Sequence, residues 1–243
     1  MKKHLNIALI GYGKMGHEIK KHAPARGHAI TVILDREEDW QANETSLKQA
    51  DVAIEFTAPQ SAPANIERCF KLGIPVVCGT TGWHDQLPRI ADLCLQMNGT
   101  LMHASNFSLG VNIFFELNRK LAAMMATFDN YRVSMSETHH TQKLDAPSGT
   151  AVSLAEDIIR AHPGIKSWVL QEEKQKDDQL PVEALRIENV TGTHTVSYHS
   201  AIDRIDIRHT AHNRSGFALG ALMAAQWVCD KKGVFTMKDL LDL

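Results

Sequence analysis

The feature of this sequence that most constrains its fold is a glycine motif at residues 11–16, which read Gly-Tyr-Gly-Lys-Met-Gly. This G-x-G-x-x-G pattern lies between an apolar run and a helix-like segment. In such a strand–turn–helix, Gly11 permits a tight turn, Gly13 lets the backbone approach a pyrophosphate, and Gly16 lets the helix pack close to the strand. The helix N-terminus then offers unpaired N–H groups and a partial positive charge. The motif predicts a Rossmann-type dinucleotide site.

The first hundred residues alternate strand-like and helix-like segments, which predicts a parallel sheet covered on both faces. Apolar runs predict strands over residues 5–10, 30–34, 52–56, 75–78 and 101–104. Helices are predicted over 15–22, 62–72 and 86–97.

The pattern changes after residue 105, and the later segments predict an α+β domain with a mixed sheet. Helices are predicted over 111–128, 149–162, 216–229 and 237–243. Strands are predicted over 131–136, 183–190, 194–201 and 205–211. The polar stretch 171–179 is expected to be a solvated loop.

Composition excludes several classes of protein. Lys and Arg number 26 against 28 Asp and Glu, which gives a net charge of −2 and no support for nucleic-acid or membrane-surface binding. No apolar run approaches the roughly 20 residues that cross a bilayer, and no signal peptide is expected. The four cysteines are scattered without a C-x-x-C pair, which predicts reduced thiols in the cytosol.

Residues that follow the predicted strands extend the nucleotide site. Asp35 lies 19 residues after Gly16 (35 − 16), where an acid would hold the adenosine ribose, whereas Arg36 could face a 2′-phosphate. Together they suggest tolerance of both NADH and NADPH. The small residues of 56–59 and 79–82 would leave room for the cofactor at the carboxyl ends of their strands, although 79–82 could also be an ordinary turn.

The segment 137–150, "ETHHTQKLDAPSGT", is the second unusual feature. It is expected to form a loop that holds two histidines, a lysine and an acid before a helix near Gly149. Histidine can exchange a proton near neutrality, and lysine can bind a carboxylate. Ser148, Gly149 and Thr150 would offer donors to an anion at the helix N-terminus.

Two simpler interpretations of this segment stay open. A structural metal site is disfavoured because adjacent histidines point in different directions and no third ligand has standard spacing. No metal is therefore predicted. The segment could also be a plain loop in which Ser148 caps the helix and no ligand is needed.

Taken together, these motifs identify a family. The sequence resembles the 4-hydroxy-tetrahydrodipicolinate reductases, also called dihydrodipicolinate reductases, of lysine and diaminopimelate biosynthesis. The matching motifs, in the family's order, are "GYGKMG", "EFTAP", "GTTG", "ASNFSLGVN" and "ETHHTQKLDAPSGTA". The His-His segment is highly specific to the family, whereas the glycine motif is not.

The resemblance implies a cytoplasmic homotetramer with two domains in each chain. Residues 1–104 and 213–243 would form the dinucleotide-binding domain, and 105–212 the substrate-binding and tetramerisation domain. The domains would close on binding around hinges near 104–107 and 212–216.

The resemblance also implies a reaction: NADH or NADPH delivers a hydride to ring C4 of 4-hydroxy-tetrahydrodipicolinate, a small cyclic dicarboxylate. The 4-hydroxyl leaves and tetrahydrodipicolinate forms. His139 resembles the family's proton donor, and Lys143 its second catalytic residue. The family's substrate contacts match His140, Gly149 and Thr150. Its cofactor contacts match Gly11, Tyr12, Gly13, Lys14, Met15, Gly16, Asp35, Arg36, Gly79, Thr80, Thr81, Ala104, Ser105, Asn106 and Phe107.

The sequence departs from the family pattern at three positions. Lys14 stands where some members carry an extra Gly and an Arg, which leaves coenzyme preference open. Glu188 replaces the glycine of an Arg-x-Gly pattern, so the strand there is expected to start differently. Ser105 replaces a frequent proline.

Two other functions remain as alternatives. A Rossmann-type amino-acid dehydrogenase would share the glycine motif but lack the compact His-His-x-x-Lys segment. A non-catalytic NAD-binding sensor would need a partner-binding or DNA-binding segment, and no basic helix is evident. His194 and Arg186 are further candidates for the anion pocket, whereas the other histidines of the strand-rich region are expected to be structural or exposed.

Overall fold

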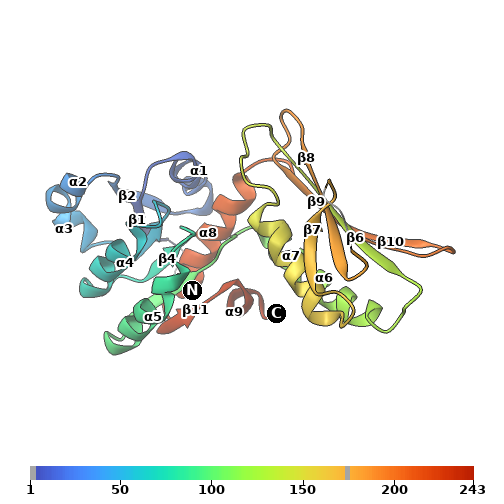
Figure 1. The fold of residues 1–243 in the computed structure, drawn as a ribbon. Coiled ribbons are helices and arrows are strands. Elements are labelled where there is room, and N and C mark those ends of the chain that lie inside the picture. Colours follow the sequence, from blue (N-terminus) through green and yellow to red (C-terminus); the bar gives the residue numbers. More distant parts are fainter. Residues whose placement is uncertain (1–3, 173–175) are drawn as a thin grey trace. The chain divides into compact units, whose positions relative to one another are not determined.

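The computed structural model describes residues 4–172 and 176–243, which form two compact units (Figure 1). The first unit comprises the described residues up to Leu109 together with Arg214–Leu243, and the second comprises Gly110–Asn213. The prediction divided the chain at 104/105 and 212/213. The assignment of substrate binding and tetramerisation to the second unit stays a prediction.

The first unit is built on a six-stranded parallel sheet with the order β11-β5-β4-β3-β1-β2. The predicted Rossmann-type sheet is therefore confirmed. Its inner strands are short and almost entirely buried, as helix-covered parallel strands must be, whereas the edge strands β2 and β11 are partly exposed. The strands are β1 (Asn6–Ile10), β2 (Ala29–Leu34), β3 (Val52–Glu55), β4 (Val76–Cys78), β5 (Thr100–His103) and β11 (Gly233–Phe235). Strand β11 was not predicted; it pairs with β5 at the edge of the sheet.

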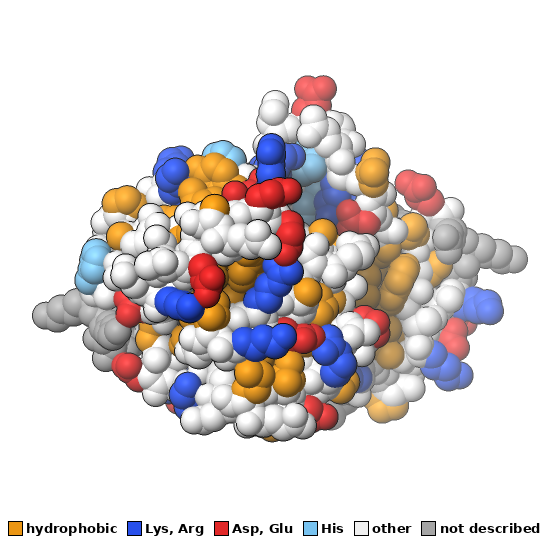
Figure 2. Space-filling view, turned by 90° about the vertical axis from the view of Figure 1, so that its left-hand side faces the viewer, with side chains coloured by type: hydrophobic (Ala, Val, Ile, Leu, Met, Phe, Trp, Pro, Cys, Tyr) orange, Lys and Arg blue, Asp and Glu red, His pale blue; other side chains and the backbone are white. Residues whose placement is uncertain are grey.

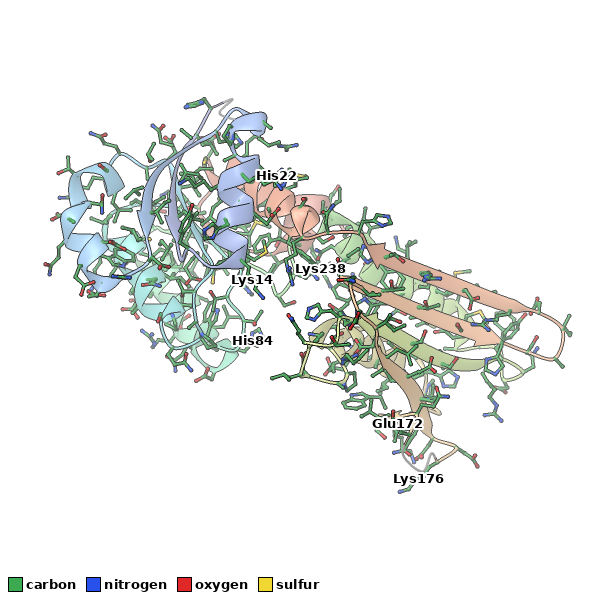
Figure 3. The ribbon with its side chains drawn as sticks, turned by 90° about the horizontal axis from the view of Figure 1, so that it is seen from above. Lys14, His22, His84, Glu172, Lys176 and Lys238 are labelled. Atoms are coloured by element: carbon green, nitrogen blue, oxygen red, sulfur yellow. The ribbon has the colours of Figure 1, made fainter. Side chains whose placement is uncertain are left out.

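The helices of the first unit connect and cover these strands. They are α1 (Lys14–His22), α2 (Glu37–Ala42), α3 (Glu44–Leu47), α4 (Ala62–Lys71), α5 (Leu87–Gln96), α8 (Ser215–Val228) and α9 (Met237–Leu241). The short helices α2 and α3 were not predicted. Figure 3 labels Lys14 and His22, which lie at opposite ends of α1.

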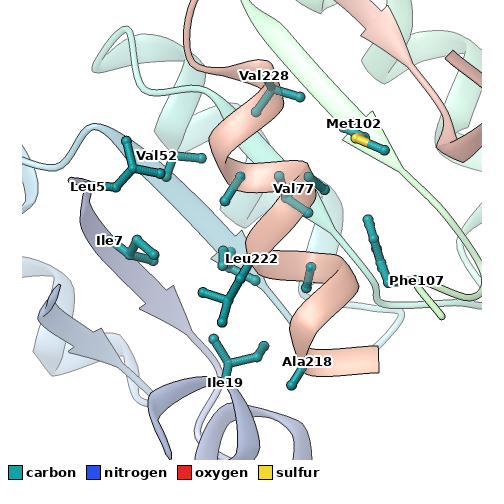
Figure 4. Close-up of a cluster of buried hydrophobic side chains, with 14 of the residues drawn as sticks. Leu5, Ile7, Ile19, Val52, Val77, Met102, Phe107, Ala218, Leu222 and Val228 are labelled. Carbon is teal, nitrogen blue, oxygen red and sulfur yellow. The ribbon is translucent and has the colours of Figure 1, made fainter. Parts of the chain in front are cut away.

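Helix α8 is apolar and forms the centre of one core cluster of the first unit (Figure 4). A helix that is hydrophobic on all sides must be buried, and Ala218, Leu222 and Val228 are fully buried. Its small residues allow close packing: a Cβ placed on Gly220 would lie 1.8 Å from the carbonyl oxygen of Phe107. This close approach fixes the segment that follows β5.

The second unit is a five-stranded mixed sheet with the order β10-β9-β6-β8-β7, as predicted. Strands β10, β9 and β6 pair antiparallel, whereas β6, β8 and β7 pair parallel. The elements are α6 (Leu109–Met125, whose first residue belongs to the first unit), β6 (Arg132–His139), α7 (Gly149–Ala161), β7 (Ser167–Leu170), β8 (Gln179–Arg186), β9 (Gly192–His199) and β10 (Arg204–Ala211).

Two predictions for the second unit are corrected, and one strand was not predicted. Strand β6 extends to His139, so Glu137 to His139 are not part of a loop. Strand β8 ends at Arg186 rather than residue 190, because the chain turns through Asn189 at a positive φ of 63°. Strand β7 was not predicted. In the polar stretch 171–179, residues 171, 172, 176 and 177 are exposed, Asp178 is half-buried, and β8 begins at Gln179; residues 173–175 lie outside the described residues.

Strand alternation places the polar end of β6 on the core face of the sheet. Met135 pairs with Val182 on one side and Val196 on the other, and all three pack in the core formed with α6 and α7. Since side chains alternate along a strand, Glu137 and His139 point to the same face as Met135. The sheet thereby delivers an acid and a histidine into a buried environment.

The surface face shown in Figure 2 mixes acidic, basic and hydrophobic side chains without a large patch of one charge. Among the described residues, no helix combines the length and hydrophobicity that crossing a bilayer requires.

Candidate active site

The three glycines of the motif occupy three different environments. Gly11 has a φ of +91°, and a Cβ there would lie 2.1 Å from the carbonyl oxygen of Phe56. A Cβ on Gly16 would lie 2.5 Å from the carbonyl oxygen of Gly11, so this glycine lets α1 pack against the turn. At Gly13 a Cβ would meet nothing within 4 Å. The first and third glycines therefore serve the fold, and the second faces open space.

The N-terminus of α1 is suited to an anionic ligand. Gly13 is its N-cap residue, no side chain caps the helix, and the first turn contains no acid. Lys14 is the first helical residue and adds a positive charge. The ring of Tyr12 stacks on His17 at 4.0 Å, which holds the turn against the helix. These residues fit a dinucleotide, because the helix N-terminus provides unpaired N–H groups beside an open glycine.

Asp35 and Arg36 directly follow β2, next to the glycine motif. Asp35 accepts a hydrogen bond from the backbone N–H of Tyr12 at 2.7 Å. The carboxylate of Asp39 accepts the backbone N–H groups of both Asp35 and Arg36 at 2.8 Å, and these hydrogen bonds lower the pKa of Asp39. Asp39 therefore fixes the backbone of Asp35 and Arg36, a role that its place in the sequence did not indicate.

The loops after β3 and β4 are bonded to each other. The backbone N–H of Thr57 donates to Oγ1 of Thr80 at 2.7 Å. Gly79 lies directly over the ring of Phe56, where a Cβ would approach ring atoms to 2.2 Å. Thr81 is exposed at the same edge of the sheet. The structure thus brings the residues of "EFTAP" and "GTTG" together.

A fully buried carboxylate, Glu55, lies behind these loops and was missed by the sequence analysis. It accepts hydrogen bonds from the hydroxyl of Thr57 and, at 3.1 Å, from the thiol of Cys78. Burial, together with the nearby Glu55 carboxylate, raises the pKa of the Cys78 thiol well above its usual value. Sequence alone shows only an acid at the end of an apolar strand, with no indication of its partners.

The segment 104–107 follows β5 at the same sheet edge. The backbone N–H of Ala104 donates to the carbonyl of Cys78 at 3.2 Å, and Oδ1 of Asn106 accepts the Ser108 N–H at 2.8 Å. The ring of Phe107 is buried 6.0 Å from that of Phe56, so this side chain belongs to the core. All predicted cofactor contacts lie in the first unit, at or near the carboxyl ends of its strands.

The second unit contains a cluster around the carboxylate of Glu137, which is fully buried. The backbone N–H of Ser148 donates to both of its oxygens, at 3.0 and 3.1 Å. Arg186 donates to Oε1 at 3.2 Å. Nδ1 of His139 lies 3.5 Å from Oε2, and Nε2 of His194 lies 3.6 Å from it. The cluster joins β6, β8, β9 and the start of α7.

Glu137 remains ionised in this environment. Burial alone would raise its pKa, but hydrogen bonds from His194 and Ser148 and the proximity of His139 outweigh burial and lower the pKa to about 2. A carboxylate this deeply buried is tolerated only with several donors. The negative charge is therefore a permanent part of the cluster at neutral pH.

His139, unlike Glu137, is held in its neutral form. Its pKa is lowered to about 4, mainly by burial; the negative charge of Glu137 raises the pKa, and the proximity of His194, Lys143 and Arg186 contributes to the lowering. Its imidazole is therefore neutral at pH 7 in the free protein. A Cβ on Gly192 would lie 3.1 Å from Nε2 of His139, so the ring has little room on that side.

The loop that carries Lys143 is held by Arg186. The guanidinium of Arg186 donates to the backbone carbonyls of Lys143 at 3.3 Å and Asp145 at 2.5 Å. The ammonium of Lys143 pairs with the Asp145 carboxylate at 2.8 Å. Arg186 therefore connects this loop to the buried Glu137.

The helix end that was predicted to bind an anion is the N-terminus of α7, and anion binding there stays a prediction. Ser148 caps α7, as the plain-loop interpretation also requires, because its hydroxyl accepts the Ala151 N–H at 3.2 Å; this hydroxyl also lies 3.1 Å from Nε2 of His194. Gly149 has no atom within 4 Å of an added Cβ, and Thr150 is the next residue of the helix. Nδ1 of His140 is buried without a hydrogen-bond partner among the described residues.

The ligand atoms of Glu137, His139 and His194 lie within 4.8 Å of one another, as in a metal site. His194 is the third ligand that sequence spacing did not reveal, since it comes from β9. The guanidinium of Arg186 already balances the charge of the carboxylate, however, and the Ser148 amide donates to both of its oxygens. The positive charge beside the carboxylate opposes a dication. The absence of a metal stays a prediction.

A Rossmann-type unit with an open glycine motif, joined to a second unit with a buried acid–histidine cluster, defines a two-domain nucleotide-dependent oxidoreductase. Residues 5–107 match the family model described as dihydrodipicolinate reductase, N-terminus, and 110–241 match the model for its C-terminus. The chain belongs to the dihydrodipicolinate reductase family. Its N-terminal domain is the NAD(P)-binding Rossmann domain of that family.

Similar proteins agree with this assignment. A 4-hydroxy-tetrahydrodipicolinate reductase of Christiangramia forsetii is 50% identical over 237 residues, which cover 98% of each chain. One from Methanosarcina acetivorans is 35% identical, covering 98% of this chain and 89% of the relative. A dipicolinate-bound dihydrodipicolinate reductase from Paenisporosarcina has the same fold, with a TM-score of 0.76, 23% identity and coverage of 96% and 97%.

Proposed function

We propose that this chain reduces 4-hydroxy-tetrahydrodipicolinate to tetrahydrodipicolinate with NADH or NADPH, in diaminopimelate and lysine biosynthesis. The observation that carries the proposal is the Glu137–His139 cluster beside the capped end of α7 and Lys143. It combines a proton-exchanging group with donors for carboxylates. Family membership and the relative at 50% identity support the reaction.

Substrate binding falls to cationic and donor groups of the second unit. The N–H groups in the first turn of α7, at Gly149 and Thr150, bind one carboxylate. Lys143 binds a carboxylate after releasing Asp145, and His140 provides a further ring nitrogen. These groups suit a small dicarboxylate better than a neutral ring.

His139 supplies the proton. Its pKa is about 4 in the free protein, so it needs an additional negative charge to become protonated at neutral pH. A bound dicarboxylate provides that charge, and with Glu137 it raises the pKa of His139. The enzyme would therefore charge its acid only when the substrate is present.

NAD(P)H, when bound, would supply the hydride. Tyr12, Lys14, Met15 and the loops at Gly79–Thr81 and Ala104–Phe107 would hold and orient it. Asp35 would contact the adenosine ribose, and Arg36 a 2′-phosphate. The chain passes between the units at Leu109/Gly110 and Asn213/Arg214, which lie close to the hinges expected for closure.

The assembly is proposed to be a cytoplasmic homotetramer. Support comes from exposed apolar side chains in the second unit, including Ile113, Leu117 and Met124 on α6 and Ile202 and Ile205 near the start of β10. Side chains of this type on a surface are typical of contacts between subunits.

The test is oxidation of NADH and NADPH at 340 nm, with substrate generated in situ from pyruvate and aspartate semialdehyde by a coupled synthase. We expect substrate-dependent loss of absorbance that falls at least 100-fold in His139→Gln while NADH affinity is retained. A folded protein that binds NADH but oxidises neither coenzyme would exclude the reductase and favour another dehydrogenase or a sensor.

A further inference from the structure

We propose that Glu137 is the positioning residue of this site: its carboxylate orients His139 and, through the Ser148 amide, holds the anion-binding end of α7 in register with it. The role rests on the proposed function of His139. It concerns a residue that does not touch substrate and acts through its neighbours.

The Glu137 carboxylate holds the start of α7 through the backbone amide of Ser148. Ser148 directs its backbone N–H at both carboxylate oxygens, although a single oxygen would satisfy it. This bifurcated bond fixes the residue immediately before Gly149, where the exposed N–H groups of α7 begin. A shift of Glu137 would therefore move the helix end relative to the histidine.

The Glu137 carboxylate also determines the tautomer of His139. Nδ1 is buried, faces Oε2 of Glu137 at 3.5 Å, and has no other partner among the described residues. A carboxylate in this position favours a proton on Nδ1, which leaves Nε2 as the atom that exchanges a proton with a ligand. The distance is longer than a normal hydrogen bond, and such contacts tighten when a ligand binds.

Glu137 is itself held by contacts from several elements of the second unit. Arg186 from β8 donates to Oε1, and His194 from β9 faces Oε2. The groups facing His139 itself are Glu137 on β6, His194 on β9, Arg186 on β8 and Lys143 in the loop. Glu137 is the acid among them, so its removal leaves the histidine among cationic or neutral groups.

The experiment compares Glu137→Gln and Glu137→Asp with Glu156→Gln, a matched loss of charge at an exposed position of α7. Turnover, substrate KM and NADH affinity are measured together with ¹⁵N NMR titration of the His139 ring. We expect Glu137→Gln to lower kcat about 100-fold and raise KM, with NADH affinity unchanged. The His139 titration should move to lower pH, and its Nδ1-protonated tautomer should be less populated.

Glu137→Asp retains the charge but withdraws both oxygens by one methylene group. It should restore most of the His139 titration but not the substrate KM, because its oxygens no longer reach the Ser148 amide. If Glu137→Gln is folded and matches Glu156→Gln in kcat, KM and His139 tautomer, the proposal is wrong. If Glu137→Gln does not fold, Glu137→Asp decides: an unchanged KM would refute the positioning role.

The NMR measurement separates this inference from the proposed function. If the wild-type chain showed no turnover, the reductase assignment would fail, yet the tautomer and titration of His139 would still report whether Glu137 positions the ring. A tautomer that does not respond to Glu137→Gln overturns the positioning role in either case.

Discussion

The backbone N–H of Tyr12 donates to Oδ1 of Asp35 at 2.7 Å, which joins the glycine motif to the end of β2. This bond orients the carboxylate next to the N-terminus of α1 and leaves its second oxygen, Oδ2, to accept from a ribose hydroxyl. Asp39 fixes the end of β2 as well, by accepting the backbone N–H groups of Asp35 and Arg36. Three separate hydrogen bonds thus hold the Asp35–Arg36 segment, which would distinguish NADH from NADPH.

Replacing Arg36 with alanine should lower kcat/KM for NADPH about tenfold and leave NADH nearly unaffected. The side chain is exposed beside Asp35 and would contact only a 2′-phosphate. Parallel assays with the two coenzymes measure the ratio. An equal loss of kcat/KM with both coenzymes would show that Arg36 stabilises the Asp35–Arg36 segment rather than binding the 2′-phosphate.

The glycine motif offers a matched pair of variants. Gly11→Ala should destabilise the protein, because φ is +91° and the new Cβ would collide with the carbonyl of Phe56. Gly13→Ala should keep the melting temperature, because nothing lies within 4 Å, but weaken NADH binding at least tenfold. Thermal unfolding and NADH titration of both variants test this division, and tight NADH binding by Gly13→Ala would contradict it.

The protein should lose stability as the pH falls from about 6.5 to 4. The pKa of His139 is about 4 in the folded state, below the ordinary histidine value of 6.5 that applies to the unfolded chain, so the unfolded chain binds the proton more readily in this window. The corresponding stability is present above pH 6.5 and is lost as the pH falls through 4. It amounts to at most about 3.5 kcal/mol, at about 1.4 kcal/mol per pKa unit.

Urea unfolding from pH 7 to pH 4 measures this effect. His139→Gln should show a shallower decline than the wild type, since glutamine does not titrate. Glu137, with a pKa of about 2, adds a further loss only below pH 4.5. Parallel declines in the two proteins would assign the acid sensitivity to other groups, such as His28 or His209, whose pKa values burial also lowers.

The ion pair between Lys143 and Asp145 competes with substrate. Asp145→Asn should lower the substrate KM by up to about fivefold, since a partly exposed ion pair contributes no more than about 1 kcal/mol. The Arg186 bond to the backbone carbonyl of Asp145 is retained in this variant. A higher KM would indicate that Asp145 holds Lys143 in its productive position.

Space around His139 is limited by Gly192. Gly192→Ala would bring a methyl group to 3.1 Å from Nε2 and should reduce kcat about tenfold by displacing the ring. Thr195→Ala, on the opposite face of β9, should leave kcat unchanged. Activity assays and the His139 NMR signal of both variants provide the comparison.

Sequence patterns predicted the parallel sheet, the mixed sheet and the glycine turn because these depend on local periodicity. Gly11 and Gly16 have the packing roles that their spacing indicated, and Ser148 caps α7 as expected. Strands β7 and β11, of four and three residues, were not predicted, although β4 and β5 are equally short. Strand β11 joins the parallel sheet only after the whole second unit, so no local strand–helix alternation indicates it.

The site itself was only partly predictable. Glu137 to His139 appeared as loop because polar residues normally mark exposed backbone, whereas here they continue β6 on its buried face. The partners of Glu137 come from β8, β9 and the start of α7, and no spacing rule connects them in one sequence. Arg186 and His194 were singled out by residue type, but their shared contact with Glu137 required the fold.

The edge strand β11 has a consequence for synthesis on the ribosome. The sheet of the first unit needs Gly233–Phe235 at its edge and α8 in its core, yet both follow the entire second unit in the chain. The second unit can therefore fold while the first is still missing its central helix. Until residues 214–243 emerge, the face of strands β1 to β5 that α8 covers stays exposed, whereas α4 and α5 already cover the other face. This is therefore the stage at which a chaperone would protect the nascent chain.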